Sequence, residues 1–233
     1  MKTYTYNHPH PAVTTDCVIF GFDGEKLKIL LIERGVAPYK GCWALPGGFL
    51  KMEGENKDRD ALDCAKRELQ EETGLSNVYI EQLQAFTASN RDPREWVITI
   101  AHYALVRISE VKGGDDAARA EWKDLDNLPA LAFDHQQIVD FAVKRLREKL
   151  RFEPVGFDLL DRKFTMTTLQ NLYEAIMGVK YDRRNFSKKM LYLGLVERLD
   201  EKVTGAPNKA PYLFRFNKER YEELKIKGVK IDF

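Results

Sequence analysis

The chain has 233 residues, of which 44% are hydrophobic and 31% are charged, and its formal net charge is +1. This composition is that of a folded globular protein and excludes a disordered chain. The three cysteines include no Cys-x-x-Cys pair, so they give no zinc signature and are typical of a reducing cytoplasm. The sequence has no basic-then-apolar leader and no run of ~20 apolar residues, so we expect a cytoplasmic protein without a membrane segment.

Charge is distributed unevenly along the chain. Residues 1–150 carry 20 Lys/Arg against 24 Asp/Glu, whereas residues 151–233 carry 17 against 12. The segment Phe152-Glu-Pro-Val-Gly ends a helical pattern close to the same place. We therefore expect two domains, 1–150 and 151–233, with the basic charge concentrated in the second.

The first domain is predicted to combine strands with two helices. Its expected elements, in chain order, are a hairpin over 17–32, a strand over 43–50 broken by Pro46-Gly47-Gly48, a helix over 60–73, strands over 78–88 and 96–108, and a helix over 134–150. Asp23-Gly24 supplies the hairpin turn. Asp60 and Gly74 are placed to cap the two ends of the first helix.

Three glutamates of the predicted helix over 60–73 share one face. Glu68, Glu71 and Glu72 stand at i, i+3 and i+4, which brings their carboxylates together. Converging carboxylates suit a hard divalent cation such as Mg²⁺ or Mn²⁺, which is usually held together with water and a substrate phosphate. The alternative is a solvated helix face. The preceding Arg67 and the upstream Gly47-Gly48 favour the metal site.

The segment Arg67-Glu-Leu-Gln-Glu-Glu-Thr-Gly-Leu75 resembles the second half of the Nudix box, Gx5Ex7REUxEExGU. The Nudix family uses Mg²⁺ on this helix to hydrolyse nucleoside diphosphates linked to another moiety. The resemblance implies that Glu68, Glu71 and Glu72 are metal ligands and catalytic carboxylates. It also implies that Arg67 organises the site and that the Gly48 carbonyl joins the shell of the ion.

The first half of the box departs from this pattern. The segment from Gly48 to Arg67 is longer than the box by five residues, and the position of the first glutamate is occupied by another residue type. Glu53 and Glu55 are the two candidates to replace that glutamate. The longer loop lies between the glycine and the helix, so the positions of the three helical carboxylates are unaffected.

A second segment, Arg91-Asp-Pro-Arg94 followed by Ala101-His-Tyr-Ala-Leu, resembles ADP-ribose pyrophosphatase-type Nudix domains. Arg91 and Arg94 flank a turn that proline fixes, and guanidinium groups bind pyrophosphate through paired hydrogen bonds. The alternative is a surface turn with solvated arginines. Arg34 and Phe49 complete the predicted ligand-binding set.

Residues 151–233 contain the order helix, turn, basic helix and hairpin. Thr167-Thr168 and Gly178 are expected to bound the first helix, and Asp182 and Gly194 the second. This is the winged-helix order, in which the second helix enters the major groove of double-stranded DNA. The predicted DNA-binding residues are Arg183, Arg184, Asn185, Lys188, Lys189, Lys202 and Lys209. The alternative is an accessory domain for dimerisation.

Over nearly its whole length the chain resembles the Nudix-related transcriptional regulators of the NrtR type. The segments Leu128-Pro-Ala-Leu-Ala-Phe-Asp-His135 and Phe164-Thr-Met-Thr-Thr-Leu carry this wider resemblance. It implies an α+β fold, with a Nudix α/β/α sandwich around a mixed sheet and then a small winged helix. It further implies a homodimer that binds operator DNA and senses an ADP-ribose-like nucleoside diphosphate in the control of NAD metabolism.

Two rival hypotheses remain at this point. The first is a metabolic Nudix hydrolase of the ADP-ribose pyrophosphatase type, in which the second domain serves dimerisation or covers the substrate. The second is a sugar-responsive regulator with a vestigial box. The retained carboxylates favour a phosphorylated ligand over a free sugar, and they are compatible with hydrolysis by a sensor domain.

Overall fold

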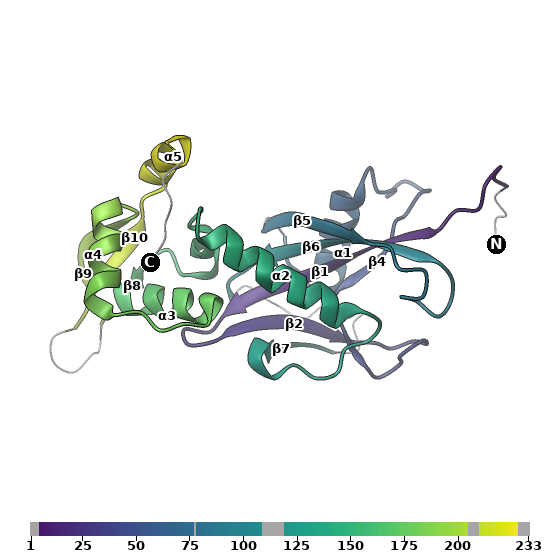
Figure 1. Ribbon diagram of the computed structural model, residues 1–233, viewed down its shortest axis with the longest axis horizontal. Helices are drawn as coiled ribbons and strands as arrows, with labels where there is room; N and C mark the ends of the chain where they lie inside the picture. Colours follow the sequence, from purple (N-terminus) through teal and green to yellow (C-terminus); the bar gives the residue numbers. More distant parts are fainter. Residues whose placement is uncertain (1–4, 77, 109–118, 205–209, 228–233) are drawn as a thin grey trace.

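The computed structural model describes residues 5–76, 78–108, 119–204 and 210–227. A large mixed sheet with helices on both faces is followed by a smaller unit built from a three-stranded sheet and helices (Figure 1). This arrangement confirms the predicted α+β fold with a sandwich and a winged helix. In the described part of the chain no helix is long and apolar enough to cross a membrane.

The large sheet has seven strands, in the order β3-β2-β1-β6-β5, with β4 paired to β1 and β7 paired to β2. β1 and β6 run parallel, and the other pairs are antiparallel. The strands are β1 (Ala12–Phe22), β2 (Leu27–Glu33), β3 (Trp43–Ala44), β4 (Gly47–Phe49), β5 (Tyr79–Phe86), β6 (Val97–Leu105) and β7 (Ala120–Asp124). The predicted hairpin and the two later strands are confirmed, whereas no strand was predicted over the residues that form β7.

The central strand β1 is buried on both faces, as its long apolar run indicates. Cys17 and Ile19 pack with Leu69 of α1 (Ala61–Thr73), and Val18 and Phe20 belong to the core shared with α2 (His135–Leu150). Successive side chains of a strand point to opposite faces, so alternate residues contact the two helices. Figure 1 shows α2 across the front of the sheet, with α1 on the far side.

Helix α1 has the caps that the sequence indicates. The Asp60 side chain accepts a hydrogen bond of 2.8 Å from the backbone N–H of Asp63, and Gly74 ends the helix with a left-handed φ of 71°. These caps satisfy backbone groups that would otherwise lack partners at the helix ends. They also fix the two ends of the helix that carries the three glutamates.

The smaller unit contains a short 3₁₀ segment, η3, and the elements of a winged helix. Its elements are η3 (Val155–Leu159), β8 (Phe164–Thr165), α3 (Met166–Met177), α4 (Arg183–Leu193), β9 (Val196–Lys202), β10 (Tyr212–Phe216) and α5 (Lys218–Ile226). Asp182 and Gly194 cap α4 as predicted, but the N-cap of α3 is Thr165, which accepts from the N–H of Thr168 at 3.0 Å. Helix α5 was not predicted, because it lacks a continuous apolar stripe.

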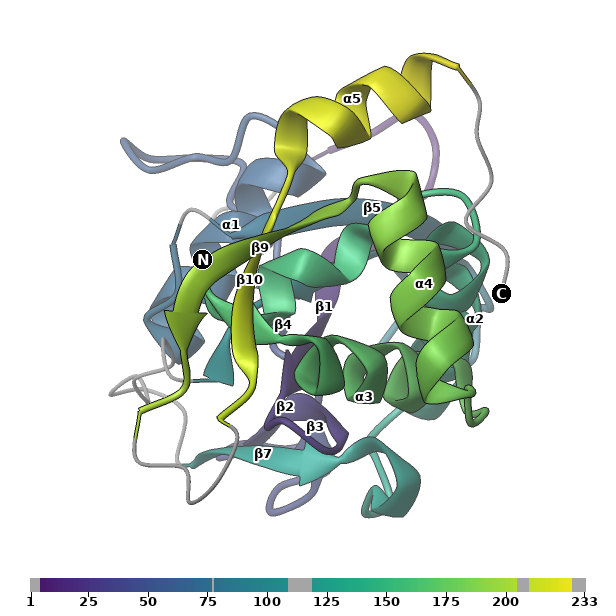
Figure 2. The same cartoon turned by 90° about the vertical axis from the view of Figure 1, so that its left-hand side faces the viewer.

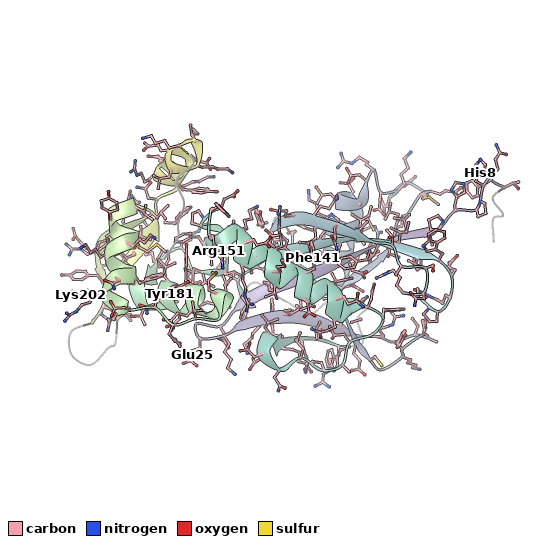
Figure 3. All side chains as sticks on the ribbon, in the orientation of Figure 1. His8, Glu25, Phe141, Arg151, Tyr181 and Lys202 are labelled. Carbon is pink, nitrogen blue, oxygen red and sulfur yellow. The ribbon has the colours of Figure 1, made fainter. Side chains whose placement is uncertain are left out.

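The two units share one hydrophobic core. A single cluster of buried side chains joins Ile138 and Leu146 of α2 to Leu172 of α3 and to Phe186 of α4. Figure 2 shows α4 and the β9–β10 hairpin nearest the viewer, with the large sheet behind them. Figure 3 places Lys202 and His8 at opposite ends of the molecule. The winged helix is therefore packed against the sandwich and not tethered beside it.

Candidate functional site

Gly47 and Gly48, predicted as a break in a strand and called the glycine loop here, instead begin the short strand β4 beside β1. They lie between β1 and α1 with no room for side chains. A Cβ atom on Gly47 would lie 2.1 Å from the Thr15 carbonyl oxygen, and one on Gly48 would lie 2.3 Å from a carboxylate oxygen of Glu68. Both distances are shorter than a non-bonded contact. Glycine at these two positions is therefore what allows the carboxylate of Glu68 to rest on the loop backbone.

Glu68 and Glu72 face this loop from α1. The backbone N–H of Gly47 donates a hydrogen bond of 2.9 Å to Glu72. Burial, followed by the charges of Glu68 and Asp16, raises the pKa of Glu72 to about 8. Burial also raises the pKa of Glu68. Carboxylates that are costly to ionise in the free protein are favourably placed for a cation, because its charge stabilises their ionised forms.

Glu71 occupies a different position from the other two glutamates. Its carboxylate lies at the surface, 3.0 Å from the Lys51 ammonium and 3.0 Å from the Arg67 guanidinium. The helical spacing places the three glutamates on adjoining parts of α1, but only Glu68 and Glu72 turn towards the glycine loop. The structure therefore separates one exposed carboxylate from two half-buried ones.

Arg67 connects the carboxylates to the loop before α1. It donates two hydrogen bonds to Asp58, of 2.9 Å and 2.8 Å, one of 2.6 Å to Glu68 and one of 3.2 Å to the Phe49 carbonyl. The hydrogen bonds from Arg67 are the main reason that the pKa of Asp58 is lowered to about 2. Arg67 thus fixes the position of Glu68 through paired, charge-assisted contacts.

The longer loop between Gly48 and Arg67 is closed at its base. The N–H of Lys51 donates to the Asp58 carboxylate at 2.7 Å, and the N–H of Asp58 donates to the Lys51 carbonyl at 2.8 Å. The extra residues therefore form an excursion that leaves both ends in place. Asp58, nine residues before Arg67, is a carboxylate of this loop that pairs with Arg67, and it was not among the predicted residues, which were Glu53 and Glu55.

A cavity of about 350 Å³ opens beside the glycine loop. All four predicted ligand-binding residues contribute to its wall, and so do Gly48 and Glu72. The wall includes Arg34, Gly48, Phe49, Glu72, Arg91, Arg94, Phe133, His135 and Asp16. The tertiary structure thus brings together the glycine loop, the end of α1, the Arg91–Arg94 turn and the start of α2.

Arg91 is buried in the cavity wall and is paired there. It donates two hydrogen bonds to Asp134, of 3.0 Å and 2.7 Å, and one of 3.4 Å to Asp16. The alternative of a solvated surface turn is therefore not what forms at this residue. Arg91 holds the residue that precedes α2 against β1, and it contributes positive charge to the cavity from a fixed position.

Arg34 and Arg94 lie against aromatic rings in the same wall. The Arg34 guanidinium lies 4.8 Å from the Phe133 ring centroid, and the Arg94 guanidinium lies 5.2 Å from that of Phe49. Arg94 also pairs with Asp92 at 2.7 Å. Phe133 was not among the predicted site residues, although it lies in the segment 128–135 that carries the wider resemblance. Stacked guanidinium groups of this kind retain free donors for a phosphate.

His135 begins α2 and is fully enclosed. Its Nδ1 accepts a hydrogen bond of 2.9 Å from the N–H of Leu45, which assigns the proton to Nε2. Nε2 lies 3.5 Å from a carboxylate oxygen of Asp16, and burial lowers the pKa of the imidazole. A neutral His135 therefore links β1, the residues before the glycine loop and α2.

The residues present fit a hard divalent cation with few protein ligands. Within the described ranges, no three His, Cys, Asp or Glu side chains form a ready metal-binding group. Two crowded carboxylates, Glu68 and Glu72, lie next to the Gly48 backbone instead. Mg²⁺ commonly takes one or two carboxylates and fills its remaining positions with water and phosphate oxygens.

The second candidate surface is the outer face of α4. Arg183, Arg184, Asn185 and Lys188 are exposed there and Lys189 is half-buried, while Phe186, Met190 and Leu193 are buried on the opposite face. Lys202 is exposed at the end of β9, and Lys209 lies outside the described residues. Arg198 and Lys202 both lie over the ring of Tyr212, at 4.7 Å and 4.8 Å. Neither Arg198 nor Tyr212 was among the predicted DNA-binding residues.

Two family profiles match the chain in the order of its two units. Residues 10–141 match the NUDIX domain, and residues 156–216 match the NrtR DNA-binding winged helix domain. A relative from Acinetobacter baylyi, described as "ADPR responsive transcriptional repressor NtrR", is 36% identical over 220 residues, which are 93% of this chain and 86% of that protein.

Two further proteins resemble this chain. An ADP-ribose pyrophosphatase from Methanocaldococcus jannaschii is 45% identical over 130 residues, which are 56% of this chain and 72% of that protein. The crystal structure of Shewanella oneidensis NrtR complexed with a 27mer DNA has a TM-score of 0.76 and 29% identity, covering 90% of this chain and 95% of that chain. With both units matched in one order, this protein belongs to the NrtR family of Nudix-related transcriptional regulators.

Proposed function

We propose that this protein is a ligand-responsive transcriptional regulator. Residues 1–150 bind a divalent cation and an ADP-ribose-like nucleoside diphosphate, and residues 151–233 bind double-stranded operator DNA. The observation that carries the proposal is the cavity in which Glu72, three arginines and two phenylalanines meet, in the same packed body as an exposed basic helix. The A. baylyi repressor, similar over nearly the whole chain, supports both parts.

The cavity offers separate partners for each part of such a ligand. Arg34 and Arg94 turn from the aromatic rings to the pyrophosphate, which exchanges a cation–π contact for a charge-assisted hydrogen bond. Phe49 and Phe133 then present their faces to the base. Arg91 stays paired with Asp134, because its hydrogen bonds hold it against β1, and it acts on the ligand only through its positive charge.

Glu68, Glu72 and the Gly48 carbonyl would hold the cation, which we take to be Mg²⁺ or Mn²⁺. When bound, the ion neutralises charge on the pyrophosphate and polarises its oxygens. Arg67 holds Glu68 in position for the cation through a hydrogen bond, and Asp58 in turn holds Arg67. Glu71, paired with Lys51 at the rim, takes a secondary part among the three glutamates.

On DNA, α4 enters the major groove with its exposed cations on the phosphates. Asn185 is of the residue type that reads adenine edges, and Lys189, Lys202 and Lys209 extend the contact towards the backbone. Operator recognition by this motif normally pairs two half-sites with a two-fold symmetric protein. We therefore propose a homodimer that works in the cytoplasm, where its DNA lies. The S. oneidensis structure, solved with DNA, supports this partner.

The test measures both partners on the intact protein. Isothermal calorimetry follows ADP-ribose with and without Mg²⁺, and fluorescence anisotropy follows a duplex selected from a random-sequence library. We expect Mg²⁺-dependent binding of ADP-ribose and DNA affinity that falls steeply with salt, since bound cations release counterions from DNA. The absence of salt-sensitive DNA binding would argue for an accessory domain instead.

Hydrolysis of the bound ligand is a second candidate activity. The two carboxylates beside the glycine loop favour it, and the M. jannaschii pyrophosphatase supports it over the first domain. Water would attack one phosphorus of the pyrophosphate, and the other phosphate would leave with its nucleoside or sugar. Product formation from ADP-ribose in Mg²⁺ buffer tests this, and binding without product would leave a sensor that has lost the chemistry.

A further inference from the structure

Helix α2 extends from the cavity to the winged helix. Its first residue, His135, is part of the cavity wall, and its last turn lies beside α3. In Figure 3 the labels on Phe141 and Arg151 mark the middle of this helix and the residue that follows it. A ligand in the cavity and DNA on α4 would therefore act on opposite ends of one continuous element.

The cavity end of α2 is held by contacts that a ligand would disturb. Phe133 has a left-handed φ of 53°, which is unfavourable for a residue with a bulky side chain. Arg34 lies over its ring, and the next residue, Asp134, is paired with Arg91. A pyrophosphate that draws Arg34 away from the Phe133 ring thus disturbs the segment that precedes α2, while Arg91 keeps Asp134 in place.

The other end of α2 holds α3 through Arg147. Its Nε donates a hydrogen bond of 2.7 Å to the Ile176 carbonyl, and its guanidinium lies beside Gly178, where a Cβ atom would be 3.4 Å away. Ile176 is in the last turn of α3, and a cation there complements the partial negative charge of a helix C-terminus. Arg147 therefore joins the end of one helix to the end of the next.

The β1–β2 hairpin makes a second link of the same kind. The Asn171 side chain of α3 donates a hydrogen bond of 3.1 Å to the Gly24 carbonyl in the hairpin turn. At the far end of β2, Glu33 and Arg34 lie in the cavity wall. Side chains of α2 and α3 fill the space between the links as one cluster, and packed interiors transmit displacement because they are hard to compress.

We propose that α2 and the β1–β2 hairpin transmit occupancy of the cavity to α3 as rigid elements, with Phe133 and Asp134 at the ligand end and Arg147 and Asn171 as positioning residues at the winged-helix end. The inference rests on the proposed function, since it assumes a nucleoside diphosphate in the cavity. It adds the route by which that ligand reorients α4, and it places the coupling within one chain.

Hydrogen–deuterium exchange of the full-length protein tests this route without knowledge of the operator. Deuterium uptake is measured by mass spectrometry with and without ADP-ribose and Mg²⁺, while calorimetry records the affinity for ADP-ribose. In the wild type, we expect the ligand to change uptake in α3 as well as at the start of α2. In Arg147→Ala with Asn171→Ala we expect the change in α3 to fall about threefold or more, with ligand affinity retained.

Lys144→Ala is the matched control, because Lys144 lies on α2 with a side chain that is 74% exposed. Its response in α3 should equal that of the wild type. Asn171→Ala alone is the second variant, should the double variant unfold, and it should show a smaller response than the control. An undiminished response in α3 in both variants overturns the coupling, whereas absence of ADP-ribose binding to the wild type overturns the proposed function and the coupling with it.

Discussion

Two arginines of the sandwich, Arg67 and Arg91, and two of the winged helix, Arg183 and Arg184, have opposite environments. The Arg67 and Arg91 side chains are 14% and 4% exposed, and each is paired with carboxylates. Arg183 and Arg184 project from α4 into solvent. The same residue type thus forms a paired network in one region and presents solvated charge in the other, and burial with its partners decides which.

This contrast has consequences for energy and for salt. Removing one partner of a buried pair leaves an uncompensated charge, so it destabilises the fold. Removing an exposed cation changes stability little, because its charge is already solvated and screened. The first region should therefore respond to mutation through folding and cation binding, and the second through DNA affinity alone.

The largest effect is expected for Glu72→Gln, which removes a carboxylate charge from the proposed cation site. Mg²⁺-dependent affinity for ADP-ribose, and any turnover, should fall by about 100-fold or more, since a lost metal ligand costs more than a lost supporting contact. Glu71→Gln is the matched control at the rim and should cost about tenfold or less. Calorimetry and product assays check both, and equal losses would contradict the division between the two glutamates.

The next effect is expected for Asp58→Asn, which breaks the buried pair with Arg67. We expect the free energy of unfolding to fall by about 3 kcal/mol, because the Arg67 charge loses its main partner. Urea denaturation followed by circular dichroism measures this. Lys163→Ala, which breaks the exposed pair with Glu201, is the control and should change the free energy by less than about 1 kcal/mol.

Arg184→Ala with Lys188→Ala tests the exposed region. DNA affinity should fall by about tenfold or more at 0.1 M salt, and the slope of log affinity against log salt should become shallower by about 2. The free energy of unfolding should change by less than about 0.5 kcal/mol. Anisotropy titrations at several salt concentrations check the first two, and a large loss of stability would show that these side chains are not simply solvated.

The smallest effect is a pH dependence that Asp58 imposes. Its pKa is lowered from 3.8 to about 2 in the folded protein, so its ionised form stabilises the fold above pH 3.8, and this contribution is lost as the pH falls through about 2. The difference in free energy of unfolding between wild type and Asp58→Asn should be constant above about pH 5 and shrink between about pH 4 and 2. A difference that stays constant down to about pH 2 would argue against the ionised pair.

Local patterns in the sequence were sufficient for most helices and strands and for the order of the two units. The caps at Asp60 and Asp182 could be predicted because each Asp side chain accepts a hydrogen bond from a backbone N–H only three residues later. The same holds for the apolar stripe of α4. Where the local signal is weak, as in the short strands and α5, packing decided the structure. Helix α3 begins after Thr165, not at the predicted Thr167, because the Thr165 hydroxyl accepts a hydrogen bond from the N–H of Thr168.

The sequence by itself determined that α1 carries three glutamates behind a glycine loop and that α4 is basic, because helical periodicity alone sets which residues share a face. Only the tertiary structure decided that Asp58 pairs with Arg67, that Arg91 is held by Asp134, and that Phe133 lines the cavity. Each of these contacts depends on how loops close and elements pack. Which of these residues meet is therefore set by the whole fold and is not encoded in any short segment of the sequence.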